Sequence, residues 1–227
     1  MSEKDREYTK YREMMYRLLS SIYINEIDEN MLRAMQEFEF PEAPAKCEGW
    51  QTDLAEGYAL IQKALAGFEG KDEQETSGLL EDLAADYART FLAAGDATGK
   101  AAFPYESYYA GTDSRFGGSI QMQLNALYAA KGFQMKKDMF SILEDHIGLE
   151  FCYMAELLRM QSGTEDEKEA ETLGTELKTF FNEHIAGWIG LFTADIYKYS
   201  ERDFYRGFAR VTRGFAEAEK LIFSGEE

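Results

Sequence analysis

Helical periodicity runs through almost the whole chain and argues against folds built on sheets. Apolar residues recur at steps of three and four, as in Leu54, Tyr58, Ile61, Leu65 and Phe68, and again in Leu79, Leu83, Tyr87 and Phe91. This spacing places one apolar stripe along one helix face. Valine occurs once, at Val211, and no segment alternates apolar and polar residues over the length of a strand. Because sheets draw on β-branched residues, we expect an all-α protein.

Helix-ending signals divide the chain into separate elements. Asp28 is placed to cap a helix that runs to about Phe38, and the pair Pro41 and Pro44 ends it. Further helices are expected near 119–131, 145–160, 171–182, 184–199 and 202–223. We therefore predict an irregular bundle of about nine or ten helices that forms a single domain over residues 1–227.

A long loop near 93–118 interrupts the helical pattern. It is rich in glycine, and it also carries the aromatic residues Phe103, Tyr105, Tyr108, Tyr109 and Phe116. Loops longer than about 12–15 residues are uncommon in compact domains. A disordered linker would not hold so many aromatic side chains. We expect this loop to pack onto the bundle or to line a groove.

The net charge of −18 restricts the partners of the chain. Nucleic acid and anionic membrane surfaces would be repelled, whereas an arginine-bearing peptide would be attracted. No run of about 18 apolar residues is present, so no segment is expected to span a membrane. Cys47 and Cys152 are isolated, and the start of the chain lacks the apolar stretch of a secretory signal. These features predict a cytoplasmic protein.

Sequence patterns for catalysis and metal binding are incomplete. The segment GDATGKA, residues 95–101, has only three residues between its glycines and an alanine where a phosphate-binding loop has a hydroxyl residue. Neither His146 nor His184 follows a glutamate by three positions, as a di-iron bundle requires. We therefore expect no metal, no cofactor and no enzymatic activity. A helical nucleotide hydrolase that uses the glycine-rich segment stays open as an alternative.

Three segments combine aromatic residues with acidic residues or histidine. They are DYARTFLAAG (86–95) running through FPYESYYAG (103–111), LEDHIGLEFCYMAEL (143–157) and FFNEHIAGWIGLFTADIYKYSERDFYRGFA (180–209). In this order they resemble the motifs of the TorD/DmsD/NarJ family of redox-enzyme maturation chaperones. The resemblance covers about residues 80–224. One departure is Glu144, which replaces the proline that the family commonly has before its Asp-His pair.

The resemblance implies a function. Proteins of this family bind the N-terminal segment of the catalytic subunit of a molybdopterin oxidoreductase, often a twin-arginine signal peptide. They hold it in the cytoplasm until the molybdopterin cofactor is inserted. We therefore expect a chaperone whose partner is such a leader, with the cofactor-inserting machinery as a second candidate partner. A helical interaction module without leader specificity stays open as another alternative.

The resemblance also implies where the peptide binds. It places Asp145 and His146 at the border of the pocket, and Glu144 would add negative charge at its edge. Asp145 is also expected to cap the following helix by accepting the amide hydrogen of Ile147 or Gly148.

The long loop adds further candidates for contact with the peptide, namely Glu106, Tyr105, Tyr108 and Tyr109. Glu106 could pair with an incoming guanidinium group. Alternatively, Glu106 and Ser107 fasten the loop to the bundle through backbone hydrogen bonds. The three tyrosines offer apolar faces with a polar rim, which suits the apolar stretch of a signal peptide. Core packing accounts equally well for at least one of them.

Overall fold

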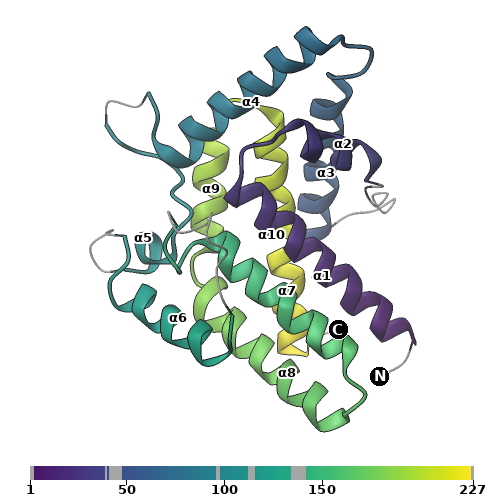
Figure 1. Ribbon diagram of the computed structural model, residues 1–227, viewed down its shortest axis with the longest axis vertical. Coiled ribbons are helices and arrows are strands. Elements are labelled where there is room, and N and C mark those ends of the chain that lie inside the picture. The colour runs from purple at the N-terminus through teal and green to yellow at the C-terminus, as the bar shows by residue number, and fades with distance from the viewer. Residues whose placement is uncertain are drawn as a thin grey trace. The chain divides into compact units, whose positions relative to one another are not determined.

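The computed structural model describes residues 3–38, 40, 48–95, 98–111, 116–133 and 142–225. Within these ranges the chain forms ten α-helices, which are labelled in Figure 1, and one π-helical turn. No strand occurs in the described ranges, where an isolated antiparallel bridge joins Tyr105 to His146. The prediction of an all-α fold is confirmed.

The chain forms two compact units, each built from two stretches of sequence. Unit 1 comprises Met1–Ile24 and Pro104–Trp188, and unit 2 comprises Asn25–Phe103 and Ile189–Glu227. The chain therefore passes repeatedly from one unit to the other. The single domain over residues 1–227 stays a prediction.

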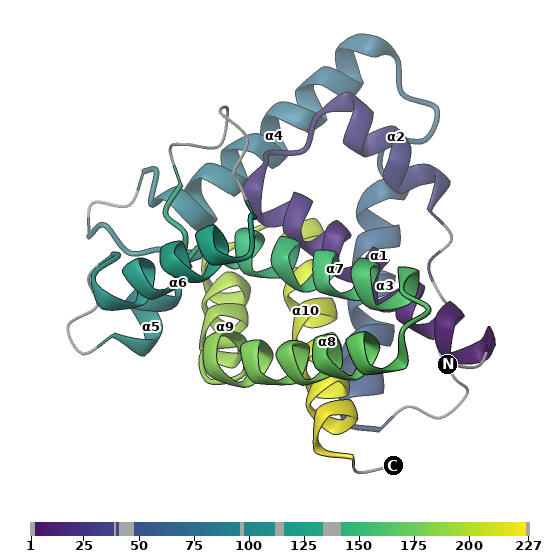
Figure 2. The same ribbon diagram turned by 60° about the horizontal axis from the view of Figure 1, so that its bottom comes forward.

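Unit 1 is organised around the helix α7. Its elements are α1 (Glu3–Ile24), α5 (Glu106–Ala110), α6 (Ser119–Ala130), α7 (Ile147–Gly163), α8 (Glu167–Phe180) and the π-helical turn η2 (Phe181–Ile185). Most residues of α7 are buried, and both α1 and α8 lie alongside it (Figure 2). The Phe151 ring on α7 contacts the rings of Tyr16 and Tyr23 on α1, with centroids 5.5 and 6.3 Å apart. Ring pairs of this kind add about 0.5–1.5 kcal/mol to the stabilisation from buried area alone.

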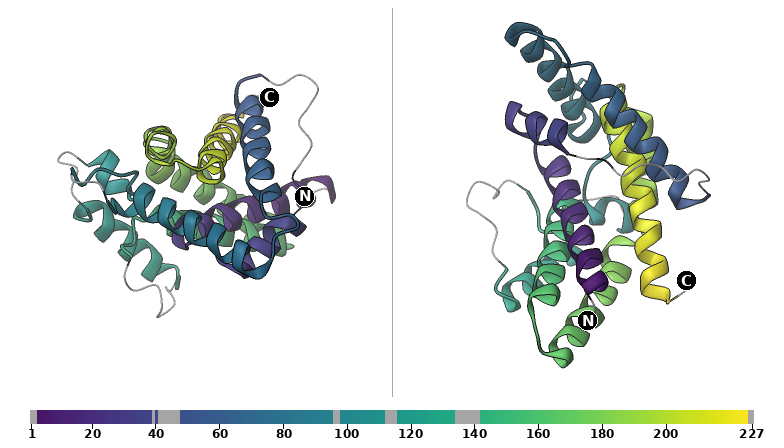
Figure 3. Two further views of the ribbon diagram at one scale, coloured as in Figure 1. Left: turned by 90° about the horizontal axis from the view of Figure 1, so that it is seen from above. Right: turned by 90° about the vertical axis from the view of Figure 1, so that its right-hand side faces the viewer.

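Unit 2 is organised around the pair α3 and α10. Its elements are α2 (Glu29–Glu37), α3 (Trp50–Ala66), α4 (Glu73–Leu92), α9 (Ile189–Tyr199) and α10 (Asp203–Ser224). Helices α3 and α10 lie side by side (Figure 3). They approach closely because Gly57 and Gly207 face each other, and a Cβ atom on Gly207 would lie 2.8 Å from the Gly57 carbonyl oxygen. Arg210 on α10 adds an ion pair with Asp53 on α3 at 3.0 Å.

A buried carboxylate joins α4 to the start of α10. Asp86 on α4 accepts hydrogen bonds from the Ser200 hydroxyl at 2.7 Å and from the backbone amides of Glu201 and Arg202 at 2.9 and 3.2 Å. Amides at the start of a helix have no partner within the helix, so this carboxylate supplies one. The neighbouring Tyr87 is buried, as its position on the apolar stripe predicts.

The helix signals read from the sequence are largely confirmed. Asp28 caps α2 by accepting the Met31 amide hydrogen at 2.8 Å. The loop predicted near 93–118 contains one short helix, α5. The expected helix break near residue 183 falls later in the chain, because η2 continues α8 as far as Ile185.

Pro41, Pro44 and Cys47, to which the sequence assigned a helix end and an isolated thiol, lie outside the described residues. No helix in the described part of the chain is both long and apolar enough to cross a membrane.

Candidate functional site

Two of the three motif segments meet in unit 1. The Glu106 amide donates to the Asp145 carbonyl oxygen at 2.9 Å, and the Ile147 amide donates to the Pro104 carbonyl oxygen at 2.9 Å. The antiparallel bridge described above lies between these two bonds. The loop segment PYES (104–107) and the Asp-His turn (Asp145 and His146) are therefore hydrogen-bonded along their backbones, although they are far apart in sequence. We call this contact between the two segments the junction.

The Asp145 carboxylate fastens this junction. It is fully buried, and its Oδ2 accepts the Ser107 amide hydrogen at 3.0 Å. The Ser107 hydroxyl in turn accepts the Gly117 amide hydrogen at 2.8 Å. Backbone hydrogen bonds thus fasten the loop at Glu106 and Ser107, which is one of the two interpretations that the sequence left open. The prediction that Asp145 caps α7 is wrong, because its carboxylate is directed to Ser107.

His146 caps α7 instead. Its Nδ1 accepts the Gly148 amide hydrogen at 3.0 Å, which requires an unprotonated Nδ1. Burial lowers the pKa of His146 to about 3, so the ring is neutral at physiological pH. The Tyr105 ring meets the imidazole edge-on, with centroids 5.1 Å apart. His146 therefore supports the loop from inside the unit.

The third motif segment reaches the junction through His184. The Nδ1 atom of His184 lies 3.0 Å from Oε2 of Glu106 in a buried pair. Burial raises the pKa of the Glu106 carboxyl group, and the hydrogen bond to His184 offsets part of that rise. Because Glu106 is only 4% exposed, its carboxylate is shielded from an incoming guanidinium group.

A π-helical turn orients His184. In η2 the Ala186 amide donates to the Phe181 carbonyl oxygen at 2.8 Å, across one residue more than in an α-helix. The Trp188 amide donates to Ile185, and the Trp188 indole N–H donates to the His184 carbonyl oxygen. His184 is therefore held through both its ring and its carbonyl group. Such turns are rare, and they are frequent at functional sites.

The loop aromatic cluster consists of Tyr105, Tyr108, Tyr109 and Phe116. The Phe116 ring lies 5.3 Å from Tyr105 and stacks on Tyr108 at 5.7 Å, measured between centroids. Tyr109 contacts Tyr108 at 5.1 Å and stacks on Trp188 at 5.4 Å, with the two planes 18° apart. Phe116 is 48% exposed, and the three tyrosines are half-buried. The expectation that the loop packs onto the bundle is confirmed, and the cluster also offers an aromatic surface.

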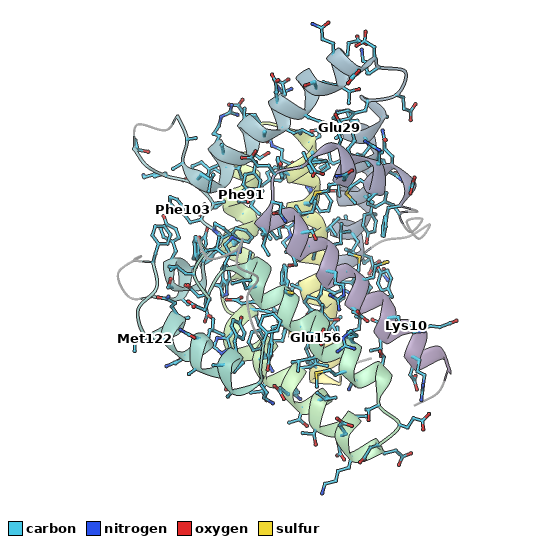
Figure 4. All side chains as sticks on the ribbon, in the orientation of Figure 1. Lys10, Glu29, Phe91, Phe103, Met122 and Glu156 are labelled. Carbon is cyan, nitrogen blue, oxygen red and sulfur yellow. The ribbon has the colours of Figure 1, made fainter. Side chains whose placement is uncertain are left out.

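Glu144 lies at the edge of the junction. It is half-buried, and it accepts a hydrogen bond from the Gln121 side chain on α6 at 2.8 Å. The next residue of α6, Met122, is 71% exposed and is labelled in Figure 4. Glu144 therefore links the Asp-His turn to α6.

A further buried carboxyl group lies near the junction. Glu150 on α7 is fully buried, and neither of its carboxyl oxygens has a hydrogen-bond partner within the described residues. Burial raises the pKa of Glu150 well above that of an ordinary carboxyl group, and the charges of Glu106 and Asp145 add to this rise. No group of three or more potential metal ligands from His, Cys, Asp and Glu is found in the described part of the chain.

All residues that the sequence assigned to peptide binding belong to unit 1. They divide by exposure into two groups. Glu106, Asp145 and His146 are buried and hold the junction together. Glu144 and the three tyrosines of the loop are partly exposed. The sequence reasoning missed the pairing of His184 with Glu106, although both residues lie in the motif segments.

Comparisons with known proteins agree with the motif segments. Residues 47–194 match the family described as "Nitrate reductase delta subunit". The chain is 26% identical over 179 residues to the chaperone protein TorD of Photobacterium profundum, which covers 79% of each chain. It is 27% identical over 215 residues to the chaperone protein TorD of Shewanella sp. strain ANA-3, which covers 92% of each chain. The chaperone protein TorD of Shewanella pealeana is 25% identical over 215 residues, 92% of this chain and 87% of the relative.

Proposed function

Because the chain belongs to the nitrate reductase delta subunit family, we propose that it binds the N-terminal leader of the catalytic subunit of a molybdopterin oxidoreductase. The chain is a molybdoenzyme-specific chaperone and not an enzyme, like its TorD relatives. In this proposal the leader carries a twin-arginine signal. The chain holds it in the cytoplasm until the cofactor has been inserted, with the cofactor-inserting machinery as a second partner.

The partly exposed loop aromatic cluster carries this proposal. A twin-arginine leader combines an apolar stretch with positive charge. Aromatic rings that are partly exposed can contact the apolar stretch without any unfolding of the loop that carries them. The net charge of −18 favours the encounter with the arginines. The buried Asp145 carboxylate supports binding indirectly, because it fastens the segment that carries the tyrosines.

The geometry does not favour a nucleotide hydrolase. A phosphate-binding loop follows a strand and opens a helix. Here the glycine-rich segment follows the helix α4, and the backbone after Lys100 stays non-helical as far as Pro104. Asp96 and Ala97 of this segment lie outside the described residues.

Titration of a synthetic twin-arginine leader against the full chain tests the proposal. We expect Tyr108→Ala to weaken leader binding about tenfold, because it removes aromatic contact area from the centre of the loop aromatic cluster. Tyr8→Ala is the matched control, since Tyr8 is a 50% exposed tyrosine on α1 of the same unit. Equal affinities of Tyr108→Ala and the parent chain for the leader would exclude the loop aromatic cluster as the surface that binds it. Failure of several leaders to bind the parent chain would favour an interaction module without leader specificity.

A further inference from the structure

A pocket of about 410 Å³ opens on unit 1 beside the π-helical turn. One part of its wall is apolar and comes from Leu127 on α6, Tyr153 on α7 and Phe180 at the end of α8. The other part carries the carboxylates of Glu176 and Glu183 together with three threonines of α8. The pocket therefore combines apolar surface with negative charge.

The sequence of α8 explains this division. Leu173, Leu177 and Phe180 are buried, and they recur at steps of four and three on the inner face of the helix. Glu176 lies on the more exposed face beside the pocket. The π-helical turn then adds a residue to the helical repeat, and Glu183 follows α8 into the same wall.

Two neighbouring side chains already contact the Glu176 carboxylate. It accepts a hydrogen bond from the Tyr153 hydroxyl, and Lys131 forms an ion pair with its other oxygen. Burial and the neighbouring Glu176 raise the pKa of Tyr153, so the phenol stays a neutral donor. A carboxylate offers about four acceptor positions, which leaves Glu176 able to accept further hydrogen bonds. Glu183 is exposed at the rim.

We infer that this pocket binds the guanidinium group of an arginine in the leader peptide, an inference that rests on the proposed function. A guanidinium group is planar, presents five N–H donors and stacks on aromatic rings. The carboxylates of Glu176 and Glu183 accept its hydrogen bonds, while the apolar wall of the pocket contacts its methylene stem. An anionic ligand would be repelled by Glu183, whereas Lys131 already compensates the charge of Glu176, and a purely apolar ligand would leave both carboxylates without a new partner.

His184 connects this pocket to the junction. Its ring lies 4.9 Å from the Phe180 ring, between centroids, and it lines the pocket. The same imidazole pairs with Glu106 at 3.0 Å, and its carbonyl group accepts the Trp188 indole hydrogen. Tyr109 of the loop aromatic cluster stacks on that indole. His184, which lines the pocket, is therefore connected to the loop aromatic cluster through Trp188.

The test uses N-acetyl-arginine amide as the probe and the full chain as the protein. Backbone amide chemical shifts of α8 and η2 are followed during titration, with N-acetyl-citrulline amide as the uncharged probe of the same shape. The variant Glu176→Gln/Glu183→Gln removes both pocket charges, while the amide oxygen introduced at position 176 can still accept the Tyr153 hydrogen bond. The matched control is Glu167→Gln/Glu171→Gln, which removes two exposed charges from the same helix outside the pocket.

We expect saturable shifts at the pocket with the arginine probe and at least about tenfold weaker binding in Glu176→Gln/Glu183→Gln, with little change in the control variant. Equal binding of the arginine and citrulline probes, or equal binding by the pocket variant and the parent chain, would overturn the inference. Leader titration of the same variants separates the two proposals. If the leader binds but the pocket variant keeps its full affinity for both the leader and the arginine probe, only the pocket assignment fails. If no leader binds the parent chain, the proposed function fails.

Discussion

The Asp145 carboxylate accepts the Ser107 amide hydrogen at 3.0 Å, across 38 positions of sequence. Together with two backbone hydrogen bonds, this bond joins the Asp-His turn to the loop that carries the aromatic cluster. Because the bond is buried, removing one partner leaves the other without a hydrogen bond. The position of the loop tyrosines therefore depends on a side chain that is itself fully buried.

Replacing Asp145 tests this dependence. We expect Asp145→Ala to lower the free energy of unfolding by about 1–3 kcal/mol, because it leaves the buried Ser107 amide without its acceptor. Asp145→Asn keeps a side-chain oxygen and should lose less. Urea denaturation measures the stability, and hydrogen exchange at the Ser107 amide reports the loop directly. Unchanged exchange at Ser107 in Asp145→Ala would contradict the assigned role.

Glu150 should make the free energy of unfolding decrease as pH rises above the unfolded pKa of about 4.3. Its pKa is raised in the folded chain, so its contribution is fully present below the unfolded pKa and is lost as pH rises through the folded pKa. Glu150→Gln carries no charge at any pH. We therefore expect the variant to become more stable relative to the parent chain as pH rises from about 5 to about 8.

The pKa of Glu156 is lowered by its hydrogen bond to Arg159, so its contribution to stability is fully present above the unfolded pKa of about 4.3. Glu156→Gln is therefore the control, and its stability relative to the parent chain should stay nearly constant over the same pH interval. Urea denaturation at both pH values measures the two differences. A pH-independent difference between Glu150→Gln and the parent chain would contradict the raised pKa of Glu150.

His146 should make the fold sensitive to acid. Its pKa falls to about 3 on folding, so its stabilising contribution is present above the unfolded pKa of about 6.5 and is lost as pH falls from there towards the folded value. His146→Asn keeps a side-chain acceptor for the Gly148 amide but cannot take up a proton. We expect its acid-unfolding midpoint, followed by near-ultraviolet circular dichroism, to lie at lower pH than that of the parent chain. Coincident midpoints would show that His146 does not drive acid unfolding.

The close approach of α3 and α10 should not tolerate a side chain at Gly207. A Cβ atom there would lie 2.7 Å from the Ile61 side chain and 2.8 Å from the Gly57 carbonyl oxygen. We expect Gly207→Ala to destabilise the chain by about 1–3 kcal/mol in thermal or urea unfolding. Gly190→Ala on α9, where a Cβ atom meets nothing within 4 Å, should be neutral or slightly stabilising. Equal stabilities of the two variants would argue against this packing.

Local features of the fold could be predicted from the sequence. The apolar stripe on α3 recurs at helical spacing, and the Asp28 cap needs only the amide of Met31, three residues away. The motif segments also made Glu106 and Asp145 candidates for the same site, and a backbone hydrogen bond joins these two residues.

Features that depend on distant partners could not be predicted in the same way. The Asp145 carboxylate could accept a hydrogen bond either from a nearby amide of α7 or from the distant amide of Ser107. No local sequence pattern shows that it accepts the Ser107 amide hydrogen. The π-helical turn has no recognised local signature in the sequence, and His184 and Trp188 contact residues that lie far from it along the chain. A glycine such as Gly207 weakens an isolated helix, and only its packing partner on α3 explains its position in α10.

The most direct test of leader recognition is a calorimetric titration of the full chain with a synthetic twin-arginine leader and with a copy in which both arginines are alanine. We expect micromolar or tighter binding of the intact leader, roughly 8 kcal/mol or more of binding free energy, and at least about tenfold weaker binding of the alanine copy. Equal affinities for the two peptides, or no heat of binding with several leaders, would contradict leader recognition by this chain.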